Sequence, residues 1–308
     1  MKLTMANKLA RSSVAIIAAA ALLWLSNASA DSVIHEERSL YSAIIVKKIG
    51  TTLCLQFTVR EDQRNQSCIN VRNRRDMLFT YTRMSMAGLL FVDDPKNILV
   101  IGLGGGTLPM AFHDLFPEAN IQSVEIDAAV VKVAREYFGF KEGPRMHVDV
   151  QDARVWTKRA MRKETRYDLI VLDAFNGDYI PEHLMTKEYL EESKAILTPN
   201  GTLMANTFTI SDLYNHESNT YLAVFDEVLS FQTMQGSNRV IIAPGLQLTD
   251  DELKARAKKI RPLFKPYSVP IRRYARDLIR IRKKGPNWDT TARILTDQYS
   301  PANLLGTQ

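Results

Sequence analysis

The feature that most constrains the fold is a regular alternation of short apolar strands and amphipathic helices between residues 97 and 207. The strand-like segments are runs of Val, Ile and Leu, as expected for strands buried on both faces. Such strands, each followed by a helix, build a parallel sheet covered on both sides. The predicted strands cover 97–101, 121–125, 146–150, 167–172 and 201–207, and the predicted helices cover 108–115, 128–138, 153–161 and 187–197. We therefore expect an α/β fold with a doubly wound, mostly parallel, Rossmann-like sheet.

The segments on either side of this alternation have different patterns. Residues 31–73 contain alternating, β-branched runs, which predict a small N-terminal antiparallel β-domain. We expect residues 74–249 to form the Rossmann-like domain and residues 250–308 to form a basic C-terminal extension. Further elements are predicted as helices over 74–91, 219–229 and 250–265 and as a strand over 239–243.

The first 30 residues have the organisation of an export signal. Three basic residues precede an apolar run over 14–25, and small residues at 28–30 precede Asp31. The apolar run is shorter than the roughly 20 residues of a membrane-spanning helix. An uncleaved anchor and a buried helix are the alternatives. We expect residues 1–30 to be a cleaved signal peptide and the protein to be exported, either periplasmic or envelope-associated.

Cys54 and Cys68 are the only cysteines of the chain. Each lies in a strand-like run, and the polar segment 60–66 between the runs predicts a hairpin. In an oxidising compartment this arrangement favours a disulfide across the two strands. The alternative is a pair of unpaired cysteines, one or both of them buried. The five histidines are scattered without ligand-like spacing, so we expect no metal site.

Basic residues are concentrated in the C-terminal extension. Between residues 254 and 284 there are thirteen Lys or Arg and one acidic residue, interleaved with aromatic side chains. Such a run most often forms a solvated helical face, and the alternatives are a phospholipid or nucleic-acid surface. We expect no specific nucleic-acid partner, and an anionic membrane surface is the candidate partner of this stretch.

Chemically distinctive residues follow four of the predicted strands. Ligands of a doubly wound sheet bind at the carboxyl ends of the strands, near the point where the strand order reverses. The strand 97–101 leads into a turn containing Gly102, Gly104 and Gly106, which allows close approach of the backbone and directs helix N–H groups at a ligand. Such a turn also occurs in dinucleotide-binding folds.

The next three strands end at acidic residues. Glu125 can accept both hydroxyls of a ribose, and Asp152 with Ala153 is placed for an adenine amino group. Asp173 follows the strand 167–172. Each acid alone is also compatible with a helix cap or a solvated loop. Together at successive strand ends they indicate a site for adenosine bearing a sulfonium, rather than for a dinucleotide.

The stretch from about residue 41 to residue 208 resembles the spermidine synthase (polyamine aminopropyltransferase) family, in its spermidine synthase-like branch with a class I methyltransferase fold. The matching motifs are the helix tyrosine Tyr81, the glycine turn, Val-Glu-Ile-Asp at 124–127, Asp-Ala at 152–153 and Tyr-Asp-Leu-Ile-Val-Leu-Asp at 167–173. Residues 294–301 also resemble a tail found in spermidine synthase-like proteins.

The resemblance implies a role for each matching residue. Glu125 holds the ribose, Asp152 holds the adenine, and Asp173 with Tyr81 orients the attacking amine and helps to deprotonate it. The resemblance implies that the protein has no tightly bound cofactor. It implies that the co-substrate is decarboxylated S-adenosylmethionine or S-adenosylmethionine and that the acceptor is a small amine. It is also compatible with a homodimer.

Three departures from the family pattern involve four residues. Gly105 stands where spermidine synthases carry an aspartate that holds the donor's amine, and Asn176 stands where a second aspartate follows the catalytic acid. Thr82 and Arg83 replace the residues that usually follow the helix tyrosine, and an inward-pointing Arg83 would repel a cationic acceptor. Our main hypothesis is an aminopropyltransferase-like enzyme. The alternatives are an S-adenosylmethionine-dependent methyltransferase and a non-catalytic envelope protein that keeps the fold.

Overall fold

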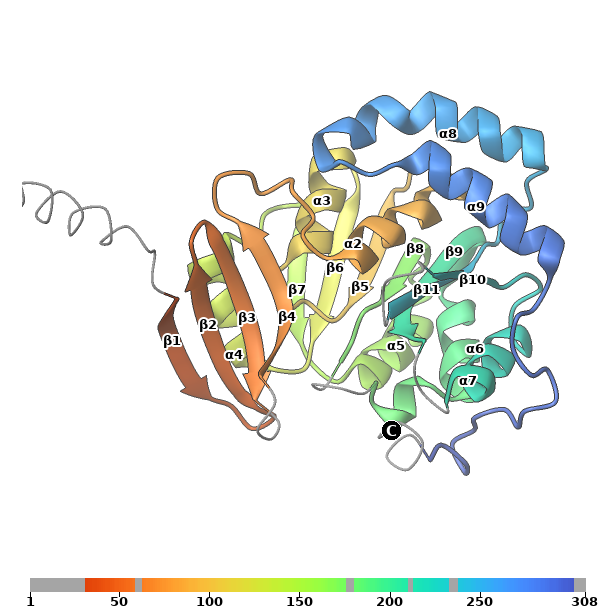
Figure 1. The fold of residues 1–308 in the computed structure, drawn as a ribbon. Helices are drawn as coiled ribbons and strands as arrows, with labels where there is room; N and C mark the ends of the chain where they lie inside the picture. Colours follow the sequence, from red (N-terminus) through yellow and green to blue (C-terminus); the bar gives the residue numbers. More distant parts are fainter. Residues whose placement is uncertain (1–30, 59–62, 176–179, 210–212, 233–237, 302–308) are drawn as a thin grey trace, which may run out of the picture.

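The computed structural model describes residues 31–58, 63–175, 180–209, 213–232 and 238–301. The predicted export signal and Asn176 lie outside these residues. The described chain forms a four-stranded antiparallel sheet and a seven-stranded, mostly parallel sheet (Figure 1). The sequence predicts an antiparallel N-terminal sheet and a mostly parallel central sheet, and the predicted fold class is confirmed.

The N-terminal sheet is a simple meander in the order β1-β2-β3-β4. Its strands are β1 (Ser32–Arg38), β2 (Ala43–Ile49), β3 (Thr52–Thr58) and β4 (Gln63–Asn70). Cys54 and Cys68 face each other across β3 and β4 and form a disulfide, which confirms that prediction. The apolar face of the sheet, including Ile44 and Leu55, packs against Val133 and Phe138. This packing docks the small sheet onto the large domain.

The large sheet has the strand order β10-β11-β9-β8-β5-β6-β7. The parallel strands are β5 (Asn97–Ile101), β6 (Asn120–Glu125), β7 (Met146–Val150), β8 (Tyr167–Leu172) and β9 (Leu197–Phe208), and the antiparallel strands are β10 (Leu229–Gln232) and β11 (Asn238–Ala243). β5 pairs with β6 on one side and with β8 on the other. The order therefore reverses between β5 and β8, so ligands are expected at the carboxyl ends of these strands.

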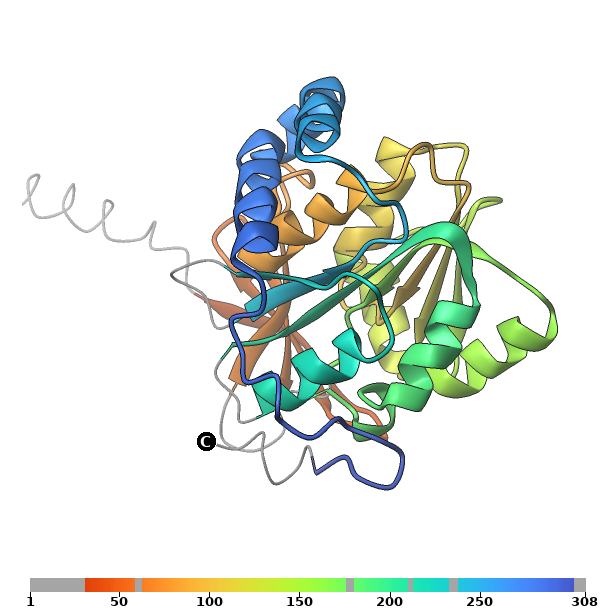
Figure 2. The same ribbon diagram turned by 90° about the vertical axis from the view of Figure 1, so that its right-hand side faces the viewer.

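Helices cover both faces of the large sheet (Figure 2). One apolar cluster joins the sheet to residues of α2 (Thr80–Ser85), η2 (Met86–Leu90), α3 (Thr107–Leu115), α8 (Asp250–Phe264), η5 (Lys265–Tyr267) and α9 (Ile271–Lys284). A second cluster joins it to α5 (Ala153–Arg162), η4 (Glu182–Leu184), α6 (Lys187–Ala195) and α7 (Leu213–Leu222). The helical segment formed by α4 (Ala128–Val133) and η3 (Ala134–Phe138) contributes to the core beneath the small sheet.

Some predicted elements were wrong in type or extent. The helix predicted over 219–229 ends at Leu222, and β10 begins at Leu229 because residues 229–232 pair with β11. Sheet pairing thus overrides a helix-like apolar spacing. The helix predicted over 74–91 begins only at Thr80, since Met77 bridges to Ile69 of the small sheet. Neither β1 nor α9 was predicted as an element.

The C-terminal extension contains more than a basic surface. Leu295 is fully buried, and Asp297 accepts hydrogen bonds from Arg154 (2.6 and 2.8 Å) and from Thr186 (2.8 Å). The Arg154 guanidinium also bonds Glu192, so it joins α5, α6 and the C-terminal tail. Within the described residues, no helix has the length and apolar character needed to cross a bilayer.

Candidate functional site

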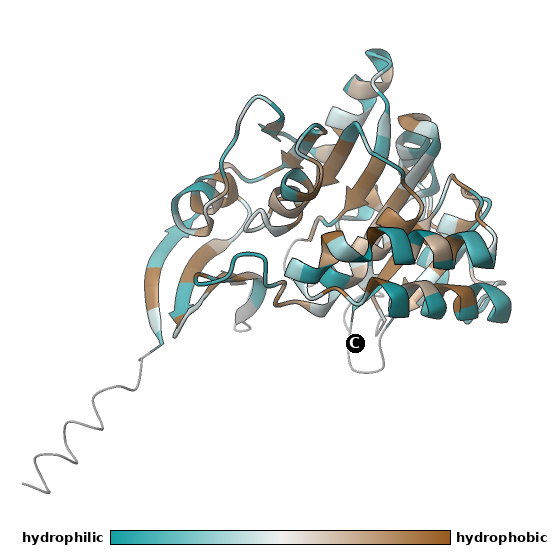
Figure 3. Ribbon diagram, turned by 90° about the horizontal axis from the view of Figure 1, so that it is seen from above, coloured by the Kyte–Doolittle hydropathy of each residue, from teal (hydrophilic) through white to brown (hydrophobic). Residues whose placement is uncertain are grey.

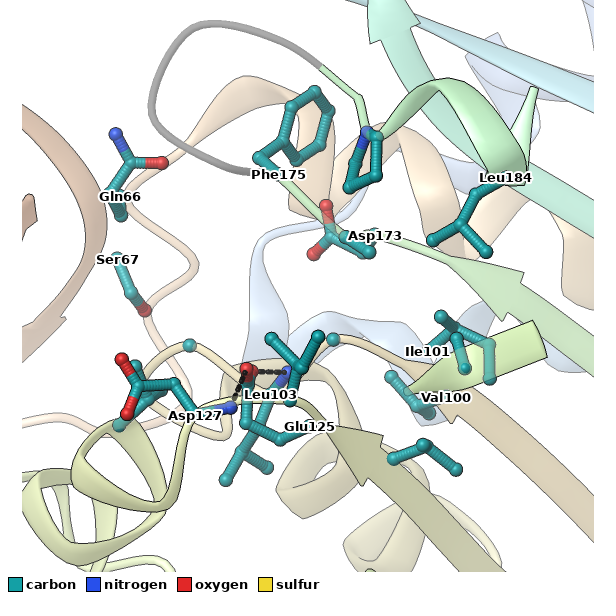
Figure 4. A pocket seen from close by; sticks show the side chains of 18 of the residues that line it. Gln66, Ser67, Val100, Ile101, Leu103, Glu125, Asp127, Asp173, Phe175 and Leu184 are labelled. Atoms are coloured by element: carbon teal, nitrogen blue, oxygen red, sulfur yellow. Dashed lines mark hydrogen bonds between the residues drawn. The ribbon is translucent and has the colours of Figure 1, made fainter. Parts of the chain in front are cut away.

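A cavity of about 260 Å³ lies at the carboxyl ends of the parallel strands (Figure 4). Its floor is formed by the glycine turn after β5 and by the residues that follow β6, β7 and β8. Gln66 and Ser67 of β4 form another wall, and Tyr41, which precedes β2, also lines the cavity. The cavity therefore lies where the strand order predicts a ligand, and the small sheet encloses it from the side.

The glycine turn brings the end of β5 against the end of β8. Gly102 has φ +92°, and a Cβ at this position would lie 2.2 Å from the carbonyl oxygen of Asp173. Only glycine fits both the backbone conformation and the available space. Gly104 and Gly106 also have positive φ values, and α3 begins directly afterwards at Thr107. Each of the three predicted glycines thus belongs to the turn that places the end of β5 beside Asp173.

Glu125 is held by backbone groups on both sides of its carboxylate. Oε2 accepts the N–H of Leu103 at 2.9 Å, and Oε1 accepts the N–H of Asp127 at 3.1 Å (Figure 4). Burial raises the pKa of Glu125, and these backbone hydrogen bonds oppose the rise. A carboxylate has about four acceptor positions, so each oxygen keeps capacity for a second donor from the cavity. This geometry suits a pair of vicinal hydroxyls.

Asp152 serves as a helix cap and also lines the cavity. Its Oδ1 accepts the N–H of Val155 at 2.9 Å, and its Oδ2 lies 2.8 Å from Nε2 of His183. Ala153 lines the cavity beside it. Asp152 therefore both caps α5 and lines the cavity, as the two interpretations of the sequence allowed. No signal in the sequence points to His183, because η4 reaches the cavity only through tertiary packing.

Asp173 and Tyr81 are brought together across 92 positions of sequence. The Tyr81 hydroxyl donates to Oδ2 of Asp173 at 3.3 Å, and Nδ2 of Asn206 donates to Oδ1 at 2.9 Å. Burial raises the pKa of Asp173 to about 7, and the nearby charge of Glu125 adds to the rise. Burial also raises the pKa of Tyr81, which keeps the hydroxyl protonated as a donor. Such a carboxylate can exchange a proton near neutral pH.

The position of Gly105 is filled by neighbouring side chains. A Cβ there would lie 2.7 Å from Cδ1 of Phe138 and 2.8 Å from Oγ of Ser67. The residue Ser67, on β4, thus occupies the space that a side chain at position 105 would need. An aspartate at this point would therefore clash with Ser67 of β4 and Phe138 of η3.

Arg83 and Thr82 do not place a positive charge in the cavity. Arg83 donates to the carbonyl of Met77 and to Oγ1 of Thr80, and the buried Thr82 donates to the carbonyl of Phe79 at 2.7 Å. Both side chains therefore bond to the segment that leads into α2. The concern that Arg83 would repel a cationic acceptor does not apply to this conformation.

Carboxylates dominate the charge of the cavity wall. Glu125, Asp127, Asp152 and Asp173 all line it. Asp127 is buried and caps α4 through Ala129, and its Oδ2 has no hydrogen-bond partner among the residues that the structure describes. A concave surface with several negative groups attracts cations. The site therefore favours a positively charged ligand.

Comparison with known proteins connects this site to one family. The model of the spermine/spermidine synthase domain matches residues 78–235. A polyamine aminopropyltransferase of Vibrio vulnificus is 45% identical over 278 residues, which cover 89% of this chain and 91% of the relative. The similarity therefore extends over the N-terminal sheet and the C-terminal helices as well as the central sheet.

Solved structures share the same fold. A probable spermidine synthase from Corynebacterium glutamicum is 22% identical with a TM-score of 0.66, covering 86% of this chain and 97% of that one. Human methyltransferase-like protein 13, solved in complex with SAH, is 26% identical with a TM-score of 0.54, covering 69% of this chain and 96% of that one. The domain match covers about half of the chain and the Vibrio relative nearly all of it, so this protein belongs to the spermine/spermidine synthase family.

Proposed function

We propose that this protein transfers an aminopropyl group from decarboxylated S-adenosylmethionine to a small amine. The amine nitrogen attacks the carbon next to the sulfonium, a C–N bond forms, and the C–S bond breaks with its electron pair moving to sulfur. The products are methylthioadenosine and a longer amine, and one proton leaves the attacking nitrogen. Orientation supplies much of the acceleration, since the sulfonium is already a good leaving group.

The observation that carries this proposal is the position of Asp173. Its carboxylate lines the cavity at the switch point, and Tyr81 and Asn206 each donate to one of its oxygens. An alkylamine is mostly protonated at neutral pH and must lose a proton before it attacks. A carboxylate with a pKa of about 7 can orient the ammonium and accept that proton. Membership of the spermine/spermidine synthase family supports the same reaction.

The charge of the cavity distinguishes between donors. Decarboxylated S-adenosylmethionine carries a sulfonium and an ammonium, whereas S-adenosylmethionine adds a carboxylate. Four acidic side chains line the cavity, so the doubly cationic donor is favoured. This selection does not need an aspartate at Gly105, because the negative charge comes from the strand ends. Methyl transfer, which would use the carboxylate-bearing donor, is the second candidate.

Calorimetric titration of the purified protein tests the choice of donor. We expect methylthioadenosine and decarboxylated S-adenosylmethionine to bind, and S-adenosylmethionine to bind at least about tenfold more weakly, a difference of ~1.4 kcal/mol. Stronger binding of S-adenosylmethionine and S-adenosylhomocysteine would replace the proposal by methyl transfer. Failure of every nucleoside to bind would favour the non-catalytic alternative.

Glu125→Gln is expected to weaken methylthioadenosine binding by roughly 10- to 100-fold, the effect of losing hydrogen bonds to a charged acceptor. The substitution removes the charge, and one of the two backbone donors now held by the carboxylate loses its acceptor. Calorimetry measures the effect. Glu118→Gln is a matched control, because Glu118 is exposed and pairs with Arg145 away from the cavity. Equal affinity in the Glu125 variant and the parent would remove Glu125 from the nucleoside site.

We further propose that the exported form meets an anionic membrane through α8 and α9. Seen from above, the strands are coloured as largely hydrophobic, whereas the two helices nearest the viewer carry hydrophilic stretches (Figure 3). Exposed cationic side chains in the segment from α8 to α9 include Lys258, Arg261, Lys265, Arg272 and Arg276, and Leu263 of α8 is also exposed. A cluster of exposed cations fits an anionic lipid surface. Export and self-association stay predictions from the sequence.

Co-sedimentation with vesicles tests this surface. Reversing Lys258, Arg261 and Lys265 to Glu is expected to reduce binding to vesicles rich in phosphatidylglycerol by roughly 100-fold or more, since each basic residue contributes about 1 kcal/mol and about 1.4 kcal/mol is tenfold. Reversing Arg162, Lys163 and Arg166, which are exposed at and just beyond the end of α5, is the control and should have less effect. If both variants lose vesicle binding equally, or if the parent does not bind vesicles, the proposal that α8 and α9 bind a membrane is rejected.

A further inference from the structure

Two asparagines on β9 and β11 form a chain of hydrogen bonds that ends at Asp173. Nδ2 of Asn206 donates to Oδ1 of Asp173 at 2.9 Å, and Nδ2 of Asn238 donates to Oδ1 of Asn206 at 3.1 Å. β9 lies between β8 and β11, so the three side chains come from neighbouring parts of the sheet. Asp173 directly follows β8, Asn206 is on β9, and Asn238 lies diagonally across from Asn206 because it pairs with Phe208. Asn206 is only 4% exposed. A buried amide in a β-sheet core requires partners, and here both of its ends have one.

The direction of these bonds fixes the orientation of the Asn206 amide. Asn238 presents an N–H to Asn206, so the Asn206 oxygen must face Asn238 and its NH₂ group must face Asp173. The reversed amide would place an oxygen against the Asp173 carboxylate and one NH₂ group against another. Both contacts are unfavourable because each lacks a donor–acceptor pair. The ionised Asp173 carboxylate can only accept, and Asn238 stabilises the same orientation of Asn206 by donating to its oxygen.

We propose that Asn238 and Asn206 act as a positioning relay, which holds the Asp173 carboxylate in the orientation and ionisation state needed for the attacking amine. The relay rests on the aminopropyl transfer proposed above. Asn206 fixes Oδ1 while Tyr81 of α2 fixes Oδ2. Neither asparagine is assigned to contact the reacting atoms, so both are positioning residues.

The groups that face Asp173 have opposing effects on its charge. Burial and the carboxylate of Glu125, at the end of β6, disfavour the ionised form, whereas the hydrogen bonds from Asn206 and Tyr81 favour it. If the hydrogen bond from Asn206 is lost, burial and the charge of Glu125 still disfavour the ionised form of Asp173. The pKa of Asp173 should rise when Asn206 no longer donates. A purely structural role for Asn238 would not move this pKa.

Three single variants of the full-length protein test the relay. Asn238→Ala removes the donor to Asn206. Asn238→Asp replaces that donor with an acceptor, which turns the Asn206 NH₂ away from Asp173. Asn120→Ala is the matched control, because Nδ2 of Asn120 donates to Oδ1 of Asn97 at 3.1 Å in a similar pair at the amino ends of β5 and β6.

The first measurement is the titration of the Asp173 carboxyl carbon by ¹³C NMR, with the signal assigned by its loss in Asp173→Asn. We expect its midpoint to move to higher pH in Asn238→Ala, to move further in Asn238→Asp, and to stay at the parent value in Asn120→Ala. An unchanged midpoint in both Asn238 variants would overturn the relay. This result does not depend on turnover, so it is separate from the fate of the proposed function.

The second measurement is turnover against pH with decarboxylated S-adenosylmethionine and a diamine. In Asn238→Ala we expect kcat to fall roughly tenfold at neutral pH, with the acid limb displaced upward and the KM for the donor unchanged. Loss of kcat without displacement of the acid limb would indicate a structural role and overturn the relay. A parent enzyme that produces no methylthioadenosine would instead reject aminopropyl transfer, and the NMR result would still decide whether the asparagines control Asp173.

Discussion

Asp173→Asn should lower the turnover of aminopropyl transfer by about 10²- to 10⁴-fold, the usual contribution of a general acid–base group. The variant keeps the size of the side chain and a hydrogen-bonding oxygen for Tyr81 or Asn206, but it cannot accept a proton from the amine. Methylthioadenosine affinity should change little, because the nucleoside is assigned to Glu125 and Asp152. Rates of product formation and calorimetric affinities together check the result.

The control for this change is Asp226→Asn, an exposed aspartate that follows α7. It should retain parental turnover. A parental rate in Asp173→Asn would remove the residue from the mechanism. Loss of both turnover and nucleoside affinity would show that Asp173 supports the whole cavity instead of acting on the amine.

The raised pKa of Asp173 also affects stability, with a definite sign. Its ordinary value is 3.8 and its value in the fold is about 7, so the folded state binds the proton more tightly than the unfolded chain. This residue therefore costs stability progressively as pH rises from about 4 to about 7. Relative to the parent, Asp173→Asn should be more stable at about pH 8 than at about pH 5. Thermal melts at the two pH values provide the check.

The sequence predicts the central sheet well because its signals are local. Continuous apolar strands followed by helices define β5 to β9, and the turn glycines and strand-end acids are read directly from the chain. These residues meet at one edge because parallel strands present their carboxyl ends together. The candidate site residues Gly102, Glu125 and Asp173 accordingly all line one cavity.

The parts that sequence reasoning missed depend on contacts between distant segments. Asn206 lies inside β9 without any motif around it, and it becomes relevant only because β8 lies next to it. His183 reaches Asp152 through the packing of η4. Ser67 fills the space beside Gly105 only after the small sheet has docked. The pairing of β10 with β11 likewise makes residue 229 part of a strand, although the periodicity of 219–229 favours a helix.

Removing the Cys54–Cys68 disulfide should lower the free energy of unfolding by about 2–4 kcal/mol. The bond joins β3 to β4 and closes a loop across a sequence separation of 14 residues. Its loss gives the unfolded chain more conformational freedom, in the entropy model of cross-links. Denaturant unfolding of the parent and of Cys54→Ala/Cys68→Ala measures the difference, and a shared midpoint would contradict the prediction. Adding a reductant should destabilise the parent and leave the double variant unchanged.

The disulfide should also affect the affinity for the ligand, because Cys68 directly follows Ser67 on β4. Ser67 lines the cavity and lies against the glycine turn, within van der Waals reach of the space at Gly104. Loosening β4 therefore moves a wall of the cavity, the proposed nucleoside site, without altering Glu125 or Asp173. We expect weaker methylthioadenosine binding by the double variant at temperatures where both proteins are folded. Unchanged affinity with reduced stability would show that docking of the small sheet, by itself, is enough to shape the cavity.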